Sequence, residues 1–155
     1  MRGKLVAYYS SVSHGHIIKG VLMHGISHYR EVKAVWDSKQ ENFHFDTEKL
    51  EEVVKSDIEQ GLIPFFVMGV TGATASGGHD NLVELGRISQ KYDLFSMIDA
   101  AWGGNFTHLE TEKHIIDGCE LADAYCFNPS KFIGTGMDSC LLYMKNKEDY
   151  FRAFK

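Results

Sequence analysis

Two residues of this sequence, an aspartate and a lysine, each follow a short apolar run and could act on one ligand. Asp99 ends the run 94–98, which is typical of a buried strand, and Lys131 lies in the loop after a second run, 124–127. A lysine amine can bind the aldehyde of pyridoxal phosphate covalently, and a carboxylate can pair with the protonated ring nitrogen. Alone, each residue is more simply a turn aspartate or a solvated lysine. Together, at the ends of two buried strands, they are what a pyridoxal phosphate site requires.

The elements that must position these residues alternate between strand and helix. Apolar or alternating runs predict strands over 5–9, 31–36, 62–68, 94–98, 124–127 and 140–144. Helical patterns predict helices over 14–25, 47–61, 80–92, 110–119 and 147–155, the second one capped by Asp46 or Thr47. Their expected inward faces include Ile17, Ile18, Val21 and Leu22 in the first helix, and Leu50, Val53, Val54 and Ile58 in the second. This alternation predicts an α/β fold with a mostly parallel sheet wrapped by helices.

Four predicted loops lie at the carboxyl ends of strands, where ligands of parallel sheets bind. They follow Tyr9, Val70, Ile98 and Phe127, and they carry hydroxyls, an imidazole, a carboxylate and an amine. The side chains in question are Ser10, Ser11, Ser13, His14, Thr71, Thr74, Ser76, Asp99, Asn128, Ser130 and Lys131. Glycines such as Gly72 would let the backbone approach a ligand. The sequence therefore predicts one pocket built from all four loops.

Composition excludes several classes of function. The 155 residues suffice for one domain with a sizeable core, and 44% hydrophobic with 24% charged residues is ordinary for a globular protein. A net charge of −5 without a basic stripe argues against a nucleic-acid partner. No apolar run approaches the ~20 residues that cross a bilayer, and no signal peptide is evident. Three widely spaced cysteines make no disulfide framework, so we expect a cytoplasmic protein with reduced thiols.

Other potentially reactive residues have simpler interpretations. His14, His16, His24 and His28 lie close in sequence, but no cysteine or carboxylate stands beside them at zinc-ligand spacing. We therefore expect no metal and interpret His16, His24 and His28 as surface or helix-face residues. The three cysteines, Cys119, Cys126 and Cys140, are interpreted as small core residues. The chain begins almost at once in a strand and ends in a helix, so we expect it to be an excerpt of a longer protein.

Six segments, in order along the chain, carry a resemblance to a known family. They are 9–14 (Tyr-Ser-Ser-Val-Ser-His), 61–66 (Gly-Leu-Ile-Pro-Phe-Phe), 72–74 (Gly-Ala-Thr), 80–82 (Asp-Asn-Leu), 99–102 (Asp-Ala-Ala-Trp) and 127–131 (Phe-Asn-Pro-Ser-Lys). As an ordered set they resemble the group II pyridoxal-phosphate-dependent amino-acid decarboxylases, most closely the aromatic-L-amino-acid decarboxylase branch. The resemblance implies that residues 1–155 are the central part of a fold-type I large domain, without its N-terminal arm and C-terminal small domain. It also implies a homodimeric parent protein that acts on an L-amino acid.

The resemblance assigns a role to each matching position. Lys131 would bind the cofactor covalently, and Asp99 would keep its ring nitrogen protonated. His14 would stack on one face of the ring and lie near the substrate, which makes Lys131, Asp99 and His14 the expected catalytic residues. The remaining cofactor contacts would be Ala101 on the opposite face, Thr74 at the ring substituents, and Asn128 and Ser130 at the phosphate.

The sequence departs from the family at three places. Ser130 stands where the family usually has a histidine, Ala73 and Ala75 where threonines are common, and Trp102 where a tyrosine is usual. The family's upstream phosphate-binding segment and its downstream catalytic-loop tyrosine have no match in this chain. Decarboxylation of an L-amino acid to an amine and carbon dioxide is the expected function. Another fold-type I reaction, such as transamination or desulfuration, and a non-catalytic fragment stay open as alternatives.

Overall fold

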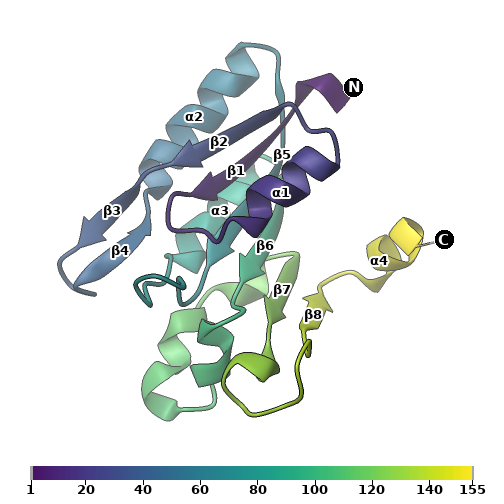
Figure 1. The fold of residues 1–155 in the computed structure, drawn as a ribbon. Coiled ribbons are helices and arrows are strands. Elements are labelled where there is room, and N and C mark those ends of the chain that lie inside the picture. The colour runs from purple at the N-terminus through teal and green to yellow at the C-terminus, as the bar shows by residue number, and fades with distance from the viewer. Residues whose placement is uncertain (1, 155) are drawn as a thin grey trace.

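A six-stranded sheet forms the framework of the protein, whose residues 2–154 are described by a computed structural model (Figure 1). The strands in spatial order are β2 (His28–Val32), β1 (Leu5–Ser10), β5 (Ile63–Val70), β6 (Phe95–Asp99), β7 (Ala124–Phe127) and β8 (Leu141–Met144). All neighbouring strands are parallel except β7 and β8, which are antiparallel. A two-stranded antiparallel hairpin, β3 (Ala34–Asp37) and β4 (Asn42–Phe45), projects from one side. The predicted α/β architecture is confirmed.

Helices cover both faces of this sheet, unequally. The α-helices within the described residues are α1 (His16–Met23), α2 (Thr47–Glu59), α3 (Leu82–Lys91) and α4 (Lys147–Phe154). Short 3-10 helices are η1 (Arg2–Lys4), η2 (Gly103–Phe106), η3 (Glu110–Ile116), η4 (Cys119–Leu121) and η5 (Pro129–Lys131). Helices α2 and α3 pack on one face, α1 lies on the other, and α4 lies apart from the sheet (Figure 1). Lys155, the last residue of the predicted C-terminal helix, lies outside the described residues.

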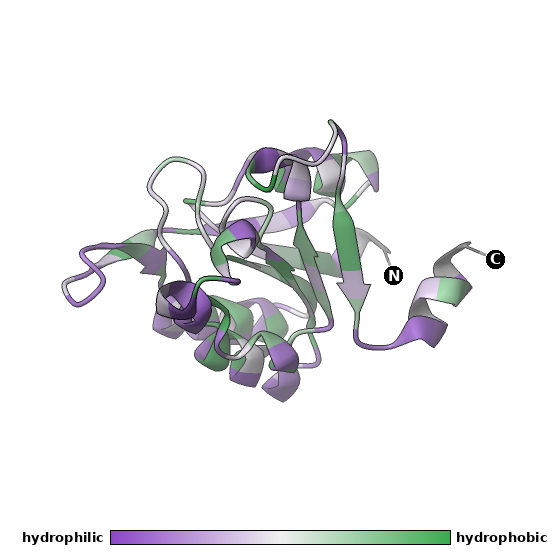
Figure 2. Cartoon of the chain, turned by 90° about the horizontal axis from the view of Figure 1, so that it is seen from below, coloured by the Kyte–Doolittle hydropathy of each residue, from purple (hydrophilic) through white to green (hydrophobic). Residues whose placement is uncertain are grey.

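The core has two layers because side chains alternate between the two faces of each strand. On the α2 and α3 side, Tyr8, Val67 and Ile98 pack against the inward faces of these helices. On the α1 side, Tyr9 and Met68 pack against the helix. Figure 2 shows the hydrophobic strands at the centre and hydrophilic residues along the outer sides of the helices. Because β1, β5, β6 and β7 are parallel, their carboxyl ends lie at the same end of the sheet.

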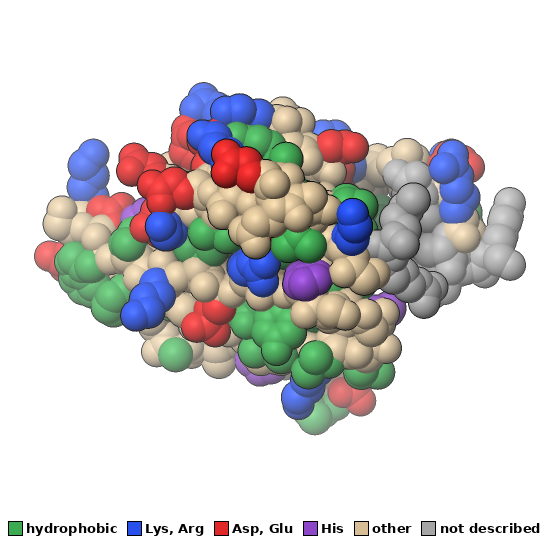
Figure 3. All heavy atoms as spheres, turned by 90° about the horizontal axis from the view of Figure 1, so that it is seen from above, with side chains coloured by type: hydrophobic (Ala, Val, Ile, Leu, Met, Phe, Trp, Pro, Cys, Tyr) green, Lys and Arg blue, Asp and Glu red, His purple; other side chains and the backbone are tan. Residues whose placement is uncertain are grey.

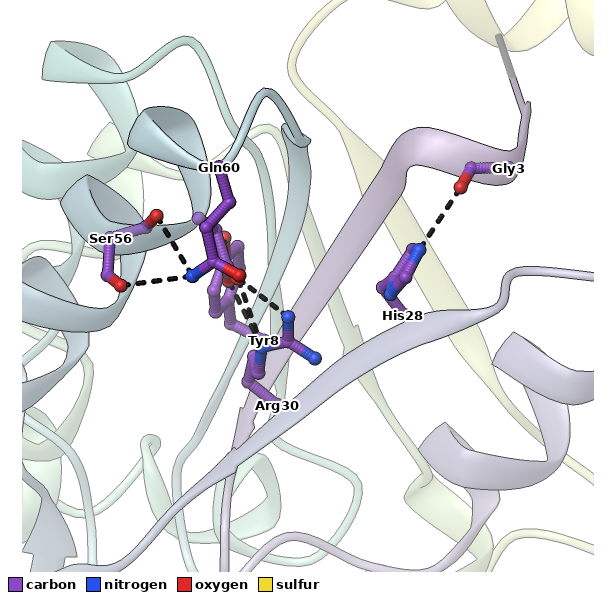
Figure 4. A network of polar contacts seen from close by, with 7 residues as sticks. Gly3, Tyr8, His28, Arg30, Ser56 and Gln60 are labelled. Carbon is purple, nitrogen blue, oxygen red and sulfur yellow. Dashed lines mark hydrogen bonds and ion pairs between the residues drawn. The ribbon is translucent and has the colours of Figure 1, made fainter.

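The inward face of α2 differs from the prediction at one position. Asp46 caps the helix by accepting from the Lys49 amide at 2.8 Å, and Leu50 and Val54 are buried as expected. Ile58, however, is 45% exposed, and its neighbour Asp57 is buried instead. Asp57 accepts from the Tyr8 hydroxyl at 2.9 Å and pairs with Arg30 at 2.6 Å. Figure 4 shows Tyr8 and Arg30 beneath the C-terminal end of α2, near Ser56 and Gln60.

Other predicted elements also need correction. The expected strand over 31–36 is divided between β2 and β3, and the intervening turn takes the chain from the sheet into the hairpin. The expected α-helix over 110–119 is the two 3-10 helices η3 and η4, separated by Gly118 at φ +93°. Leu22 is 57% exposed because only Ile17 and Val21 of α1 reach the sheet closely enough to be buried. Asp80 precedes α3, but Asn81 caps that helix.

The outer surface of the described residues is mixed in character. Acidic and basic side chains are interspersed on the face shown in Figure 3, with no continuous basic stripe there. No helix within residues 2–154 is long and apolar enough to cross a membrane.

Candidate functional site

The four predicted loops meet at the carboxyl ends of β1, β5, β6 and β7 and enclose a cavity of about 320 Å³. Six of the seven predicted site residues line it: His14, Thr74, Asp99, Ala101, Asn128 and Lys131. The seventh, Ser130, does not line the cavity, because its hydroxyl donates to the Ser139 carbonyl at 3.1 Å. The parallel order of the strands therefore brings together residues that lie far apart in the sequence.

Asp99 is the best-fixed of these residues. It is the last residue of β6, it is only 6% exposed, and it is held in register between Val70 and Cys126 of the flanking strands. Its Oδ1 accepts from the Ala101 amide at 3.0 Å, so the turn after the strand sets the orientation of the carboxyl group. Its Oδ2 lies 3.7 Å from Nδ1 of His16. A buried carboxylate thus lines the cavity with one oxygen already committed to the backbone.

Lys131 approaches the cavity from the loop after β7. It ends the single turn η5, which Pro129 begins, and its amide donates to the Asn128 carbonyl at 3.0 Å. The Asn128 amide in turn donates to the Ala101 carbonyl at 3.2 Å, which ties this loop to the turn that carries Asp99. Within the described part of the chain, the Lys131 amine has no hydrogen-bond or ion-pair partner. It is available to bind a ligand.

Two histidines form the wall that belongs to the start of α1. The rings of His14 and His16 are stacked with centroids 5.3 Å apart and planes inclined by 28°. Their Nδ1 atoms are 3.1 Å apart, and both residues line the cavity. His16 is exposed and begins α1, in line with its interpretation as a surface or helix-face residue. Its ring also lines the cavity beside Asp99, which the sequence did not predict.

Another part of the cavity wall depends on a close approach of two loops. Gly72 has φ +75°, and a Cβ there would lie 2.5 Å from Cα of Gly103 and 2.9 Å from Cε3 of Trp102. Only glycine permits this contact, because any side chain would separate the loops. Ala101 and the exposed Thr74 complete this wall. The cavity lining therefore combines small residues with two imidazoles.

Asp80 anchors the loop that carries Gly72 and Thr74. Its two carboxyl oxygens accept from the amides of Phe45 and Val70, each at 2.7 Å. Burial raises its pKa to about 6, although the two amide hydrogen bonds and the nearby His44 lower it. Asp80 is therefore a structural acid that joins the hairpin strand β4 to the end of β5, and it does not line the cavity.

Of the three cysteines that we expected to be small core residues, Cys119 packs against the core, whereas Cys126 and Cys140 do not meet the expectation. Cys119 and Cys126 are half-buried, and Cys140 is exposed. Cys126 and Cys140 both line the cavity. Burial raises the pKa of the Cys126 thiol to about 12, and the charge of Asp99 adds to this increase. Cys126 is thus a protonated, weakly reactive wall of the site at neutral pH.

Six lining residues escaped prediction from the sequence as site residues: His16, Val70, Met97, Trp102, Cys126 and Cys140. Strand periodicity could have identified two of them, because Met97 and Asp99 share one face of β6 and Cys126 and Asn128 share the same face in the next strand. No local pattern could have identified His16, since its role depends on a contact with Asp99 from a distant strand.

This set of groups fits pyridoxal phosphate. A buried carboxylate suits a protonated ring nitrogen, and an unpaired lysine amine suits an aldehyde. The lining includes an imidazole and the small Ala101, which are suitable surfaces for a flat ring to pack against. The donor set contains the groups that this cofactor uses, within one cavity of suitable size.

Comparison with known proteins agrees with this assignment. Residues 1–155 match the pyridoxal-dependent decarboxylase conserved domain. The chain belongs to the pyridoxal-dependent decarboxylase family, which confirms the resemblance identified from its motifs.

Curated relatives cover almost the whole chain. The 4-hydroxyphenylacetaldehyde synthase of Rhodiola rosea is 34% identical over 143 residues, which are 92% of this chain and 29% of that protein. The aromatic-L-amino-acid decarboxylase of Sus scrofa is 33% identical over 152 residues, 98% of this chain and 30% of that protein. The chain therefore spans less than a third of the length of these relatives.

Solved structures give the same result for the fold. The crystal structure of the Rhodiola rosea enzyme superposes with a TM-score of 0.92 at 30% identity, over 98% of this chain and 32% of that one. The tryptophan decarboxylase of Catharanthus roseus, solved in complex with L-tryptophan, gives 0.91 at 25% identity, over 99% of this chain and 32% of that one. The sheet and its surrounding helices are thus those of this group of enzymes.

Proposed function

We propose that residues 1–155 are the central, cofactor-binding part of the large domain of a pyridoxal-phosphate-dependent amino-acid decarboxylase. The reaction is removal of the α-carboxylate of an L-amino acid to give an amine and carbon dioxide. One observation carries the proposal: Asp99, Lys131 and His14 line a single cavity at the carboxyl ends of three strands. Aromatic substrates are favoured because relatives include tyrosine decarboxylases and an aromatic-L-amino-acid decarboxylase.

Lys131 and Asp99 have different proposed roles toward the cofactor. Lys131 would hold the cofactor covalently through its aldehyde. Asp99 would keep a proton on the ring nitrogen, because an adjacent negative charge favours the protonated form. When bound, pyridoxal phosphate supplies the electron sink for the electron pair left by carbon dioxide.

The remaining lining residues orient and enclose the ring. His14 would stack on one face of the ring and Ala101 would pack against the other, while Thr74 would hydrogen-bond the ring substituents. Asn128 would help to hold the phosphate. Ser130 belongs to this proposal only if its hydroxyl leaves the Ser139 carbonyl, to which it donates in the structure. The six lining residues therefore form the core of the proposed site.

Aldehydes are a second class of product that the assay of function must measure. Two relatives that cover over nine-tenths of this chain are a 4-hydroxyphenylacetaldehyde synthase and a phenylacetaldehyde synthase, at 34% and 35% identity. Their names indicate aldehydes as products, whereas the decarboxylases give amines. Transamination and desulfuration use the same lysine and aspartate, so the residues of this chain alone do not choose which bond breaks.

The proposal extends to the parent protein. We propose a homodimer, in line with the family resemblance, and a cytoplasmic location. The second point is supported by the three cysteines, which form no disulfide, as is usual in a reducing compartment. The partner that the cavity supports is a small L-amino acid.

Product analysis tests the function. The full protein is supplied with pyridoxal phosphate and with L-tyrosine, L-tryptophan or L-phenylalanine, and amine, aldehyde and carbon dioxide are measured. We expect amine and carbon dioxide from at least one substrate, loss of both in Lys131→Ala, and retention in Lys39→Ala, a lysine exposed in the β3–β4 turn. Aldehyde in place of amine would favour the synthase reaction. Keto acid without carbon dioxide would overturn the decarboxylase proposal.

A further inference from the structure

We propose that His16 is a positioning residue that fixes the tautomer and ring orientation of His14 and links it to Asp99. The inference deepens the proposed function, because His14 is the imidazole that stacks on the cofactor there. It concerns a residue to which the family resemblance assigns no role.

The contacts of His14 determine which of its nitrogens carries the proton. Its Nδ1 lies 3.3 Å from the backbone amide of His16, and an amide N–H can only donate. Nδ1 of His14 is therefore an acceptor without a proton. A neutral His14 then carries its proton on Nε2.

The same logic assigns the proton of His16. Its Nδ1 lies 3.1 Å from Nδ1 of His14, which is already an acceptor, and 3.7 Å from Oδ2 of Asp99, which can only accept when ionised. Because Nδ1 of His14 is an acceptor, Nδ1 of His16 must be the donor in the 3.1 Å contact, while Asp99 at 3.7 Å is within ion-pair distance but too far for a hydrogen bond. The three side chains form a chain of contacts that runs from Asp99 through His16 to His14.

This arrangement restrains the ring of His14 more than stacking alone would. His14 itself is exposed and lies in the loop before α1, where an isolated side chain would turn freely. His16, the first residue of α1, holds it through both its backbone amide and its ring. Asp99, whose Oδ1 binds the Ala101 amide, adds an electrostatic contact to the ring of His16 through Oδ2 at 3.7 Å. A ring that is already oriented costs less entropy when a planar ligand stacks on it.

Substitution of His16 by asparagine or by leucine distinguishes hydrogen-bond donation to His14 from simple filling of space. In His16→Asn the side-chain amide nitrogen can take the place of Nδ1 and still donate, whereas His16→Leu fills the space without a donor. His16→Ala serves as a second donor-free variant, in case the leucine disturbs folding. His28→Ala is the control, because His28 lies on β2 and contacts the Gly3 carbonyl, away from the cavity.

The first readout is nuclear magnetic resonance of ¹⁵N-histidine in the cofactor-free full protein. We expect His14 as a single tautomer protonated on Nε2 in the wild type, His16→Asn and His28→Ala, and as a mixture in His16→Leu and His16→Ala. A proton on Nδ1 of His14 in the wild type, or an unchanged single tautomer in both donor-free variants, would overturn the inference. This readout needs no turnover, so it is independent of whether the proposed reaction is correct.

The second readout is the affinity for pyridoxal phosphate, measured by absorbance titration in a double-mutant cycle. We expect about fivefold to tenfold weaker binding in His16→Leu, the loss of one oriented hydrogen bond, and a change below about twofold in His16→Asn. Because His16 acts through His14, the double variant with His14→Leu should bind no more weakly than His14→Leu alone. Additive losses would show that His16 contacts the cofactor independently, which contradicts the proposed role.

Discussion

At the scale of single residues, burial separates the acids that support the fold from the acid that serves the site. Asp57 and Asp80 are buried, and their carboxyl oxygens are bound by other protein groups. Asp57 accepts from Tyr8 and pairs with Arg30, and Asp80 accepts from two backbone amides. Asp99 is also buried, but only one of its oxygens is bound to the backbone. Its position in the cavity, rather than its burial, makes it the candidate partner of a cationic ring.

Replacement of Asp99 by asparagine tests that role. The amide preserves size and the hydrogen bond from Ala101, but a neutral group cannot hold the ring nitrogen protonated. We expect Asp99→Asn to bind pyridoxal phosphate and to lose at least about 100-fold in kcat, the scale for removal of one electrostatic stabiliser. Asp117→Asn, outside the cavity, is the control. Near-normal turnover in Asp99→Asn would leave the carboxylate only a structural role.

At the scale of elements, two devices hold the loop after β5 in place: the carboxyl group of Asp80 and the contact of Gly72 with the turn after β6. The first joins β4 to β5, and the second joins the loop to η2. Both act on backbone groups and not on a ligand. They explain how a loop with the exposed Thr74 at its tip can still form a wall of the cavity.

The pH dependence of stability should report on Asp80. Burial raises its pKa from 3.8 to about 6, so between these values the native state keeps a proton that the unfolded state has lost. The contribution of Asp80 to the unfolding free energy therefore falls as pH rises from about 4 to about 6, by up to ~3 kcal/mol. Urea unfolding of wild type and Asp80→Asn across this range should show their difference shrinking. A constant difference would mean that Asp80 stays ionised in the native state.

Gly72 should be intolerant of a side chain. Its φ of +75° and the 2.5 Å separation that a Cβ would have from Cα of Gly103 both oppose alanine. We expect Gly72→Ala to lower the unfolding free energy by about 1–3 kcal/mol and to weaken cofactor binding, since the wall must move. Gly136→Ala, where a Cβ meets nothing within 4 Å, should change stability by less than about 0.5 kcal/mol. Equal effects of the two substitutions would rule out this account of the loop contact.

Elements that depend on local sequence signals could be predicted, whereas elements that depend on contacts with distant segments could not. Strands β5, β6 and β7 could be located because they are short apolar runs, and α2 because its cap and periodic apolar face are local signals. Strand β4 is harder to locate: its residues Asn42–Phe45 alternate between polar and apolar, but so short an alternation is a weak signal, and the Asp80 carboxyl that binds the Phe45 amide comes from a distant segment. The departure of η3 and η4 from an α-helix likewise depends on Gly118, which lies against the backbone of Val83.

The residues of the site also divide into those that local signals predict and those that depend on distant contacts. Six of the seven predicted residues line the cavity because parallel strands place their carboxyl ends together, a rule that needs no side-chain detail. Ser130 turns away because its partner, the Ser139 carbonyl, comes from the returning loop. His16 and Cys140 enter the cavity through tertiary contacts that no local spacing encodes. Their roles in binding stay predictions until they are measured.

At the scale of the whole molecule, much apolar surface lies on the α1 side of the sheet. A groove of about 610 Å³ runs between α1 and the sheet, and its lining includes Leu5, Phe65, Phe66 and Met97. The edge strand β8 exposes Leu141, Leu142 and Tyr143. Exposed apolar patches of this kind favour association and poor solubility.

We expect residues 1–155, expressed alone, to lack decarboxylase activity, even if they bind pyridoxal phosphate weakly. The chain spans less than a third of the length of its curated relatives, and we propose that a catalytic-loop tyrosine and an upstream phosphate-binding segment, which the family resemblance implies, are not among these residues. We expect product from aromatic L-amino acids only with a version extended at both ends to the length of the relatives. Comparable turnover in the short and extended versions would show that residues 1–155 already hold the complete machinery.

The central claim is that this cavity binds pyridoxal phosphate through Lys131. Its most direct test is borohydride reduction of the full protein after addition of the cofactor, followed by mass analysis of its peptides. We predict a visible absorbance band before reduction and, after it, a stable cofactor label on the peptide that contains Lys131. The label should be absent in Lys131→Ala. A label on another lysine, or none in the wild type, would contradict the account.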